Sequence, residues 1–422
     1  MIFEVSASLE APVEIIGAKA RGLVEMTRLG LPVPSAFVIP ASACRSFLRD
    51  GSMPDGLDDA VARIAGAGTL VSVRSGAAVS MPGMMNTILN VSRARVREAV
   101  PAVFSSWNTP RAVTYRELHS IPHDLGTAVI VQAMVFGDRD QHSGTGVAFS
   151  RDPATGERAL YGEVLFGRQG DAVVAGESET QPLHDLAVRE PGMWEELGSA
   201  LAALERHYRD ACHVEFTFEA GRLWFLQVRP GGLVGRAAVR VAVDLVDEGL
   251  IDRRTAVARV SSRDLRLARA LYISTTADLD VLARGIGASP GVAAGRIALT
   301  ADHAVQMARS GPVVLVRPHT SPVDMHGLAL AAGVVTSRGG PTSHAAVVAR
   351  SMAKPAVVAA TTLTVDPTSA CVFAGSRVVP EGTPITIDGA SGLIVLGSPA
   401  ISEGAGDPHL ARLKGWAASR SL

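Results

Sequence analysis

The chain has 422 residues, of which 47% are hydrophobic and 19% charged, and its formal net charge is −1. This balance excludes binding to nucleic acid or to an anionic membrane through net charge, and the length predicts more than one domain. The first residues lack a basic segment leading into an apolar core, and no stretch approaches the ~20 apolar residues that span a bilayer. Cys44, Cys212 and Cys371 are widely separated and form no zinc pattern, which fits a reducing compartment. We therefore expect a cytoplasmic protein with neither a membrane nor nucleic acid as its partner.

Segments of strand and helix alternate along the first half of the chain. The stretches GTLVSVRSG, GTAVIVQAMVF, GTGVAFS and RLWFLQVRPG are typical of strands bounded by turn residues. Apolar residues then recur at helical spacing from 235 to 284, and short valine and isoleucine strands follow from GIGASPGVAAGRIAL to GTPITIDGASGLIVLG. We predict a multidomain α+β protein with a first unit at 1–234, a helical linker at 235–284, a β-rich second unit at 285–398 and a small helix or loose tail at 399–422.

The stretch VSVRSGAAVSMPGMMNTILN places Arg74 at the end of a predicted strand and follows it with a loop that contains Gly83. Glycines let backbone N–H groups approach phosphate oxygens, and the arginine fork matches the geometry of a phosphate. The residues alone leave two interpretations open. The stretch is either a loop that closes over a polyphosphate or a mobile surface loop whose methionines cover apolar surface.

Two further places in the first unit could contact a phosphate or a metal ion. Lys19 stands at the start of a predicted helix in a chain whose other lysines are Lys354 and Lys414. The stretch HVEFTFEAGRLWFLQVRPG predicts a hairpin that brings Glu215 across from Gln227 and Arg229. A carboxylate and an amide oxygen can hold Mg²⁺, although lone residues of these types are more often solvated.

The second unit contains GGPTSHAAVVARS, with His344 at the start of a predicted helix. Thr342 or Ser343 can cap that helix, and its amino-terminal N–H groups favour an anionic group on the imidazole. A neutral imidazole can attack phosphorus and carry a phosphoryl group. The alternative is a purely structural histidine at the start of the helix that is bonded within its own turn.

Taken together, these stretches resemble the pyruvate, phosphate dikinase family, and the similarity also covers IIGAKARGLVEMTRLGLPVPSAFVIP, SGTGVAFSRDPATGER, LYGEVLFGRQGDAVVAG and GGPTSHAAVVARSMAKPAVVAA. The resemblance implies an ATP-grasp nucleotide-binding domain at 1–234 and a swivelling phosphohistidine domain at 285–398. It implies ATP and inorganic phosphate as substrates, with Mg²⁺ as cofactor. Carried over residue by residue, it implies phosphate-binding roles for Lys19 and Arg74, a metal-side role for Glu215 and Gln227, a nucleotide-site role for Arg229, a closing-loop role for Gly83 and phosphorylation of His344.

The sequence departs from the family in several places. The barrel that binds pyruvate and phosphoenolpyruvate in the family has no counterpart here, and the passage after NTILN is shorter than in the family. Individual positions also differ: His213 and Asn86 stand where the family has aspartates, and Ala353 and Ala356 replace a glycine and a cysteine. Three functions remain open: transfer to pyruvate on a separate barrel protein, transfer to another small molecule, or a non-catalytic nucleotide-binding remnant. The sequence does not settle the oligomeric state.

Overall fold

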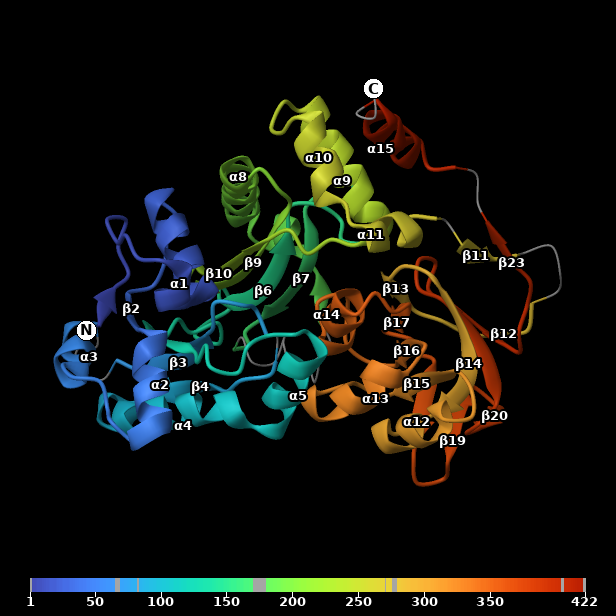
Figure 1. Ribbon diagram of the computed structural model, residues 1–422, viewed down its shortest axis with the longest axis horizontal. Coiled ribbons are helices and arrows are strands. Elements are labelled where there is room, and N and C mark those ends of the chain that lie inside the picture. The colour runs from blue at the N-terminus through green and yellow to red at the C-terminus, as the bar shows by residue number, and fades with distance from the viewer. Residues whose placement is uncertain are drawn as a thin grey trace. The chain divides into compact units, whose positions relative to one another are not determined.

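The computed structural model describes residues 2–64, 69–81, 83–169, 180–269, 271–274, 279–403 and 406–419. Residues 170–176, at the end of the family-like stretch LYGEVLFGRQGDAVVAG, lie outside this part. The chain forms two compact units, the first with residues 1–145, 166–168 and 214–229 and the second with residues 146–165, 169–213 and 230–422. Both units mix helices with sheets (Figure 1), which confirms the predicted multidomain α+β fold.

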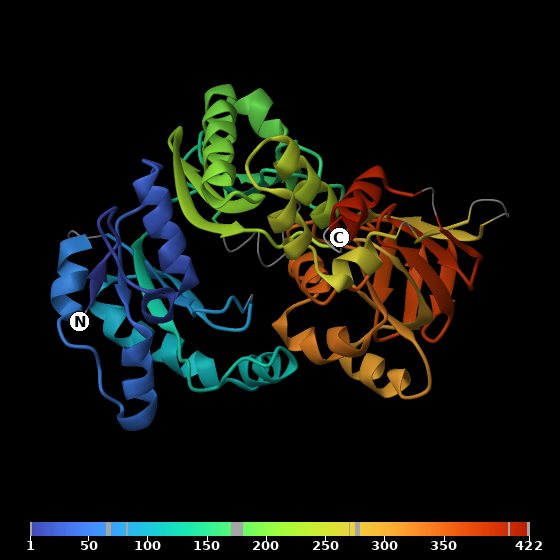
Figure 2. The same cartoon turned by 45° about the horizontal axis from the view of Figure 1, so that its top comes forward.

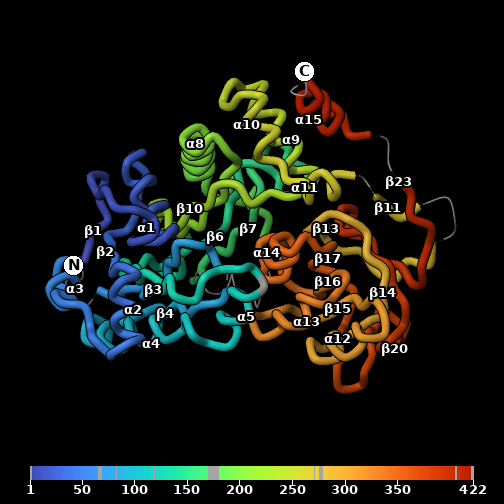
Figure 3. Tube along the Cα trace, in the orientation of Figure 1, coloured from blue at the N-terminus to red at the C-terminus, as the bar shows by residue number. Residues whose placement is uncertain are grey.

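The first unit is built on a five-stranded sheet in the order β1-β2-β5-β3-β4. Its buried residues are mainly β-branched and aromatic, and α4 packs against β3 and β4 (Figure 3). The hairpin of β9 and β10 forms one edge of a second five-stranded sheet and turns at Ala220 and Gly221, as the sequence predicts. The strands are β1 (Phe3–Glu4), β2 (Ala36–Ile39), β3 (Val71–Gly76), β4 (Thr87–Val91), β5 (Ala128–Ala133), β9 (Cys212–Glu219) and β10 (Arg222–Pro230). The helices are α1 (Val13–Arg28), α2 (Ala41–Asp50), α3 (Leu57–Ile64), α4 (Val96–Ser105) and α5 (Pro110–Leu118).

The second unit is dominated by an eight-stranded sheet in the order β12-β22-β21-β14-β15-β16-β17-β13. The sheet is parallel from β14 through β15 and β16 to β17, and the helices α12, α13 and α14 lie in the connections between these strands. The strands are β12 (Val281–Arg284), β13 (Ile286–Ser289), β14 (Val292–Ala298), β15 (Val313–Arg317), β16 (Gly333–Thr336), β17 (Ala356–Val358), β21 (Pro384–Asp388) and β22 (Leu393–Leu396). The connecting helices are α12 (Ala301–Ala308), α13 (Met325–Leu330) and α14 (His344–Ser351).

Smaller elements complete the second unit. Its earlier part contains β6 (Gly144–Phe149), β7 (Tyr161–Phe166), β8 (Gln181–Pro182), α7 (Asp185–Arg189) and α8 (Pro191–Tyr208). A three-stranded sheet is formed by β18 (Leu363–Asp366), β19 (Cys371–Ala374) and β20 (Arg377–Pro380).

The predicted linker and tail pack on each other. The helices α9 (Gly235–Asp247), α10 (Arg253–Arg259) and α11 (Ser262–Leu267) lie in the linker, and α15 (Pro408–Ala418) packs on α9 and α10 through Leu410 and Leu413 (Figures 1 and 2). The strands β11 (Leu271–Ile273) and β23 (Ile401–Glu403) pair antiparallel (Figure 3). The helical prediction was therefore wrong beyond Leu267, because β11 and β12 gain strand partners that the local pattern does not reveal. In the described part of the chain, no helix combines the length and the apolar character that crossing a membrane requires.

Candidate functional site

A kink in α1 positions Lys19 beside the end of β3. Gly17 interrupts the helix with φ of 80°, and a Cβ atom there would collide with the carbonyl oxygen of Gly76. The N–H of Ala18 donates to the carbonyl oxygen of Ala77 at 3.1 Å, which holds the two segments together. Glycine is needed at the kink both for its positive φ and for this close approach. Lys19 thus begins the second part of α1 next to the strand that carries Arg74.

Arg74 brings two chain segments together that are far apart in sequence. Its Nη2 donates to Oε2 of Glu215 at 2.9 Å and to Oε1 of Gln227 at 3.3 Å, while Nη1 donates to the carbonyl oxygen of Leu226 at 3.1 Å. Arg229 lies on the other side of the Glu215 carboxylate, with Nη2 at 3.8 Å from Oε1. The structure therefore brings Glu215, Gln227 and Arg229 together, as the hairpin pattern predicts, and places Arg74 of β3 among them.

Lys19 belongs to the same group of charges. Burial, together with the nearby positive charges of Arg74 and Arg229, lowers the pKa of Lys19 to about 7 against the opposing effect of the Glu215 carboxylate. These influences require the four side chains to lie within electrostatic range of one another. We call Lys19, Arg74, Glu215, Gln227 and Arg229 the cationic cluster, because three cationic side chains surround one carboxylate. Such an excess of positive charge suits a polyphosphate.

The oxygen atoms of Glu215 and Gln227 suit a hard cation. Both converge on one nitrogen of Arg74, so that they already face a positive group together. Among the residues that the structure describes, no group of three or more His, Cys, Asp and Glu side chains could hold a metal ion. A Mg²⁺ ion bound here would therefore complete its six ligands with phosphate oxygens and water, as this ion commonly does.

Gly83 lies in a different setting from the cationic cluster. It is exposed, has φ of 71° and forms part of the turn between β3 and β4. The positive φ explains why glycine stands there. Its predicted role in closing over phosphates stays a prediction.

His344 is the first residue of α14, directly after the loop that follows β16. Its Nδ1 lies 3.1 Å from Oγ1 of Thr320, and its Nε2 is buried without a hydrogen-bond partner among the described residues. Burial lowers the pKa of His344 to about 4, against the opposing effect of the Asp324 carboxylate. The imidazole is therefore neutral at pH 7. With the Nδ1 hydrogen donated to Thr320, the lone pair would reside on Nε2.

The expected cap of α14 is not formed by a side chain. Ser343 occupies the capping position, but its Oγ makes no cap hydrogen bond and is buried without a partner among the residues described. The hydroxyl and the N–H of Thr342 instead donate to the carboxylate of Glu163. The prediction that Thr342 or Ser343 caps the helix was wrong, because a carboxylate that is distant in sequence takes the threonine. His344 is also not bonded within its own turn, since its Nδ1 partner is Thr320.

Sequence reasoning missed three residues around His344. Thr320 fixes the orientation of the ring, Glu163 contacts the loop, and Arg350 donates to the carbonyl oxygens of Ala288 at 3.0 Å and Pro341 at 2.8 Å. An arginine within the apolar run HAAVVAR was a visible signal for Arg350, because a buried guanidinium requires acceptors. Nothing local marks Thr320 or Glu163.

Two departures from the family also have defined surroundings. The Oδ1 atom of Asn86 accepts a hydrogen bond from Nη2 of Arg111 at 2.8 Å. The ring of His213 lies 5.1 Å from that of Phe149, measured between centroids. Asn86 and His213 are thus integrated into local packing.

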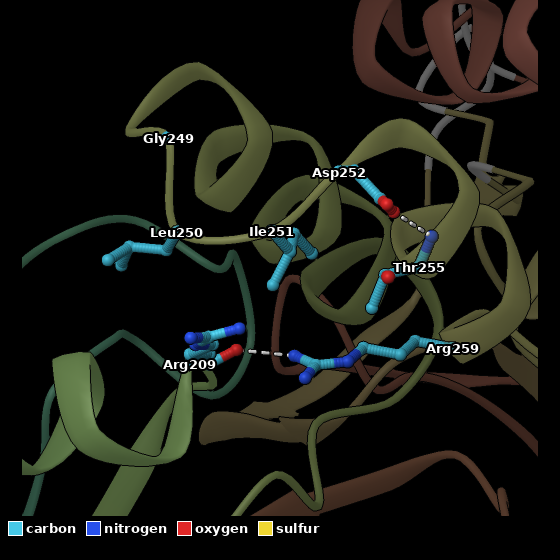
Figure 4. Close-up of a pocket in the computed structure, with 7 residues that line it drawn as sticks. All are labelled: Arg209, Gly249, Leu250, Ile251, Asp252, Thr255 and Arg259. Atoms are coloured by element: carbon cyan, nitrogen blue, oxygen red, sulfur yellow. Dashed lines mark hydrogen bonds between the residues drawn. The ribbon is translucent and has the colours of Figure 1, made fainter.

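A pocket of about 420 Å³ lies elsewhere in the second unit (Figure 4). It is lined by Arg209 after α8, by residues 249–252 before α10 and by Thr255 and Arg259 of α10, and Arg259 donates there to the carbonyl oxygen of Arg209. Asp252 caps α10 at the same place by accepting from the N–H of Thr255 at 2.6 Å. The residues lining this pocket include no member of the cationic cluster and not His344, so the pocket is separate from the predicted chemistry.

Comparisons with known proteins match segments in both units of the chain. Residues 13–66 and 57–187 match the pyruvate phosphate dikinase AMP/ATP-binding domain, and residues 310–392 match the mobile domain of PEP-utilising enzymes. The pyruvate, phosphate dikinase of Rhizobium meliloti (strain 1021) is 37% identical over 87% of this chain and 54% of its own length. That of Clostridium symbiosum is 34% identical over 80% of this chain and 51% of its own length. The chain thus spans about half the length of these curated relatives.

Among solved structures, D-alanine-D-alanine ligase from Helicobacter pylori aligns with a TM-score of 0.26 and 11% identity over 54% of this chain and 57% of its own. D-cycloserine synthetase DcsG aligns with a TM-score of 0.31 and 15% identity over 55% of this chain and 70% of its own. The assignment does not depend on these two alignments. It depends on the two domain matches and on the long sequence similarity to curated dikinases, which place this chain in the pyruvate, phosphate dikinase family of PEP-utilising enzymes.

Proposed function

We propose that this protein is an ATP-dependent phosphotransferase that phosphorylates its own His344 and passes the phosphoryl group to an acceptor. In this proposal, residues 1–234 form an ATP-grasp nucleotide-binding domain and residues 285–398 form a swivelling phosphohistidine domain. Family membership supports the coarser activity, because the relatives are named as pyruvate, phosphate dikinases.

The state of His344 is the observation that carries the proposal. A buried nitrogen without a hydrogen-bond partner is costly and therefore rare in native proteins. Nε2 of His344 is such an atom among the described residues, and the ring is neutral because burial lowers its pKa to about 4. A neutral nitrogen with an unused lone pair is what attack on phosphorus requires. Thr320 sets the ring orientation from the opposite nitrogen.

The cationic cluster would hold the donor. Lys19, Arg74 and Arg229 supply positive charge for ATP phosphates, and Glu215 and Gln227 are the residues that would hold Mg²⁺. When bound, Mg²⁺ supplies neutralisation of charge on the phosphate oxygens. Arg74 has to exchange its bonds to Glu215 and Gln227 for bonds to phosphate. Phosphoryl transfer depends mainly on such positioning and charge neutralisation.

The proposed overall step uses ATP and inorganic phosphate. Nε2 of His344 attacks the β-phosphorus of ATP, the bond between this phosphorus and the AMP oxygen breaks, and AMP leaves. The γ-phosphoryl group then passes to inorganic phosphate to give pyrophosphate, which leaves one phosphoryl group on His344. The phosphohistidine then transfers its group to pyruvate bound by a separate barrel protein. Transfer to a different small molecule and a non-catalytic remnant are the competing outcomes.

Incubation with Mg²⁺, [β-³²P]ATP and inorganic phosphate tests the proposal. We expect AMP formation and an acid-labile, base-stable labelled protein, and we expect His344→Ala to lose the label while retaining ATP binding. A label that persists in His344→Ala contradicts the assignment of the nucleophile. A wild-type protein that binds ATP without acquiring any label supports the remnant. Chasing the labelled protein with pyruvate, with and without a candidate barrel protein, then identifies the acceptor.

A further inference from the structure

The loop between β16 and α14 is held from two sides within the second unit. On one side, the buried guanidinium of Arg350 donates to the carbonyl oxygen of Pro341 at 2.8 Å. On the other side, the carboxylate of Glu163 accepts the N–H of Thr342 at 2.9 Å and also the hydroxyl of Thr342. Arg350 belongs to α14 and thus holds its own helix start. Glu163 comes from β7, a strand that is 179 residues away from Thr342 in sequence.

The Glu163 carboxylate is buried and accepts hydrogen bonds through both of its oxygen atoms. Only 6% of the residue is exposed, and its Oε1 also accepts the hydroxyl of Thr180 at 2.5 Å. The backbone of Gly340 approaches so closely that a Cβ atom there would collide with the same carboxylate. Gly340 has no positive φ, so its lack of a side chain serves this approach and not a special backbone conformation. A buried carboxylate, a threonine and a glycine therefore fit one another across a long sequence separation.

The two sides of the contact match different family domains. Glu163 lies in the segment that matches the AMP/ATP-binding domain, whereas Gly340 and Thr342 lie in the segment that matches the mobile domain. Thr342 is two residues before His344, so the hydrogen bonds that hold Thr342 also restrict the position of the nucleophile. The carboxylate of Glu163 therefore bonds the loop that carries His344.

We propose that Glu163 is a positioning residue for phosphoryl transfer, which latches the His344 loop through Thr342 while His344 is unmodified and releases it once His344 carries a phosphoryl group. The proposal rests on the function proposed above and adds the residue that holds the acceptor loop in place. Release follows from charge. A phosphoryl group on His344 adds negative charge two residues from the threonine that the buried Glu163 carboxylate holds, and like charges repel more strongly where water is scarce.

Hydrogen exchange of the loop and the rate of His344 labelling test the latch together. Exchange is followed on the peptide that covers residues 338–343, in which Pro341 contributes no amide and the Thr342 amide reports directly on the Glu163 bond. In Glu163→Gln we expect faster exchange of this peptide than in the wild type, a labelling rate lowered about 10- to 100-fold, and an unchanged thermal shift with ATP. In wild-type protein that has been phosphorylated and freed of nucleotide, we expect exchange close to that of Glu163→Gln.

Further variants separate a latch from a general loss of stability. Thr342→Ser keeps both donor groups and should behave as wild type, whereas Thr342→Val keeps only the N–H and should fall between wild type and Glu163→Gln. Gly340→Ala should slow labelling in the wild-type background and have much less effect in Glu163→Ala, because the added methyl group then meets no carboxylate. Glu196→Gln, on the exposed surface of α8, is the matched charge control.

The latch is overturned if Glu163→Gln leaves loop exchange or the labelling rate unchanged, if the effects of Gly340→Ala and Glu163→Ala simply add, or if the phosphorylated loop stays as protected as the unmodified one. A wild-type protein that acquires no label refutes the proposed function instead. The exchange difference between unmodified wild type and Glu163→Gln does not need phosphorylation, so the holding contact is judged in either case.

Discussion

In the first unit, the guanidinium of Arg74 donates hydrogen bonds to Glu215, Gln227 and the carbonyl oxygen of Leu226. In the second unit, by contrast, Nε2 of His344 has no hydrogen-bond partner among the described residues. In the cationic cluster one carboxylate thus neutralises part of the positive charge, and a ligand has to displace existing hydrogen bonds of Arg74 to enter. The imidazole is neutral and has no bond at Nε2 to break. The difference indicates that changes in the first region act on ATP binding and charge neutralisation, while changes at His344 act on the transfer itself.

The largest effect within the cationic cluster is expected for Arg74→Met. Loss of the guanidinium removes a phosphate partner and leaves the Glu215 carboxylate facing incoming phosphates without the cation that now lies 2.9 Å away. We expect the single-turnover rate of His344 labelling to fall about 100- to 1,000-fold. Arg74→Lys should recover part of the rate, since it restores charge without the fork.

Arg63→Met, on the exposed side of α3, is the control for loss of one positive charge in the first unit. If Arg74→Met labels His344 as fast as this control does, Arg74 has no part in transfer, and the contrast between the two regions disappears.

A smaller effect is expected from the titration of Lys19. Burial lowers its pKa to about 7, so the free protein carries the ammonium below pH 7 and loses it as the pH rises above that value. Phosphate binding favours the charged form, so ATP affinity should weaken about tenfold between pH 6.5 and pH 8.5. Isothermal titration calorimetry across this range measures the change.

Lys19→Arg separates this effect from the titration of ATP itself, because a guanidinium stays protonated throughout the range. We expect a flatter pH profile for Lys19→Arg than for the wild type. Matching profiles would show that the Lys19 ammonium does not face the nucleotide. His344 should contribute no comparable change above pH 6, since its pKa is lowered to about 4.

Sequence patterns predict the cationic cluster better than the surroundings of His344. Glu215, Gln227 and Arg229 share one hairpin, and alternation along strands is enough to bring them together. Their meeting with Arg74 depends on β3 lying near that hairpin, which local pattern leaves open but family resemblance supplies. The glycine at position 17 is visible in the sequence, yet its role in kinking α1 against Gly76 emerges only in three dimensions.

Around His344, the sequence identifies the reactive residue and misses what holds it. Thr320 and Glu163 come from segments with no periodic or motif relation to GGPTSHAAVVARS, so only tertiary structure reveals them. The failed cap prediction has the same cause. A serine at the N-cap usually accepts from the N–H two or three residues on, but Oγ of Ser343 makes no such bond, and the Thr342 hydroxyl donates to a buried carboxylate.

The smallest expected effect concerns the other end of α14, where backbone strain is expected to affect stability but not phosphoryl transfer. The helix ends in a Schellman motif, in which the N–H of Lys354 donates to the carbonyl oxygen of Ala349 at 2.9 Å and that of Ala353 to Arg350 at 3.0 Å. This motif requires a left-handed residue, and Ala353 adopts it with φ of 48° although alanine is disfavoured there. Ala353→Gly should therefore raise the free energy of unfolding by about 1 kcal/mol, measured by urea denaturation.

The same substitution in the middle of α8, Ala202→Gly, should lower the free energy of unfolding by a similar amount. Because the motif lies at the far end of the helix from His344, the labelling rate should not change. A slower rate in Ala353→Gly would show that this strain helps to place the nucleophile.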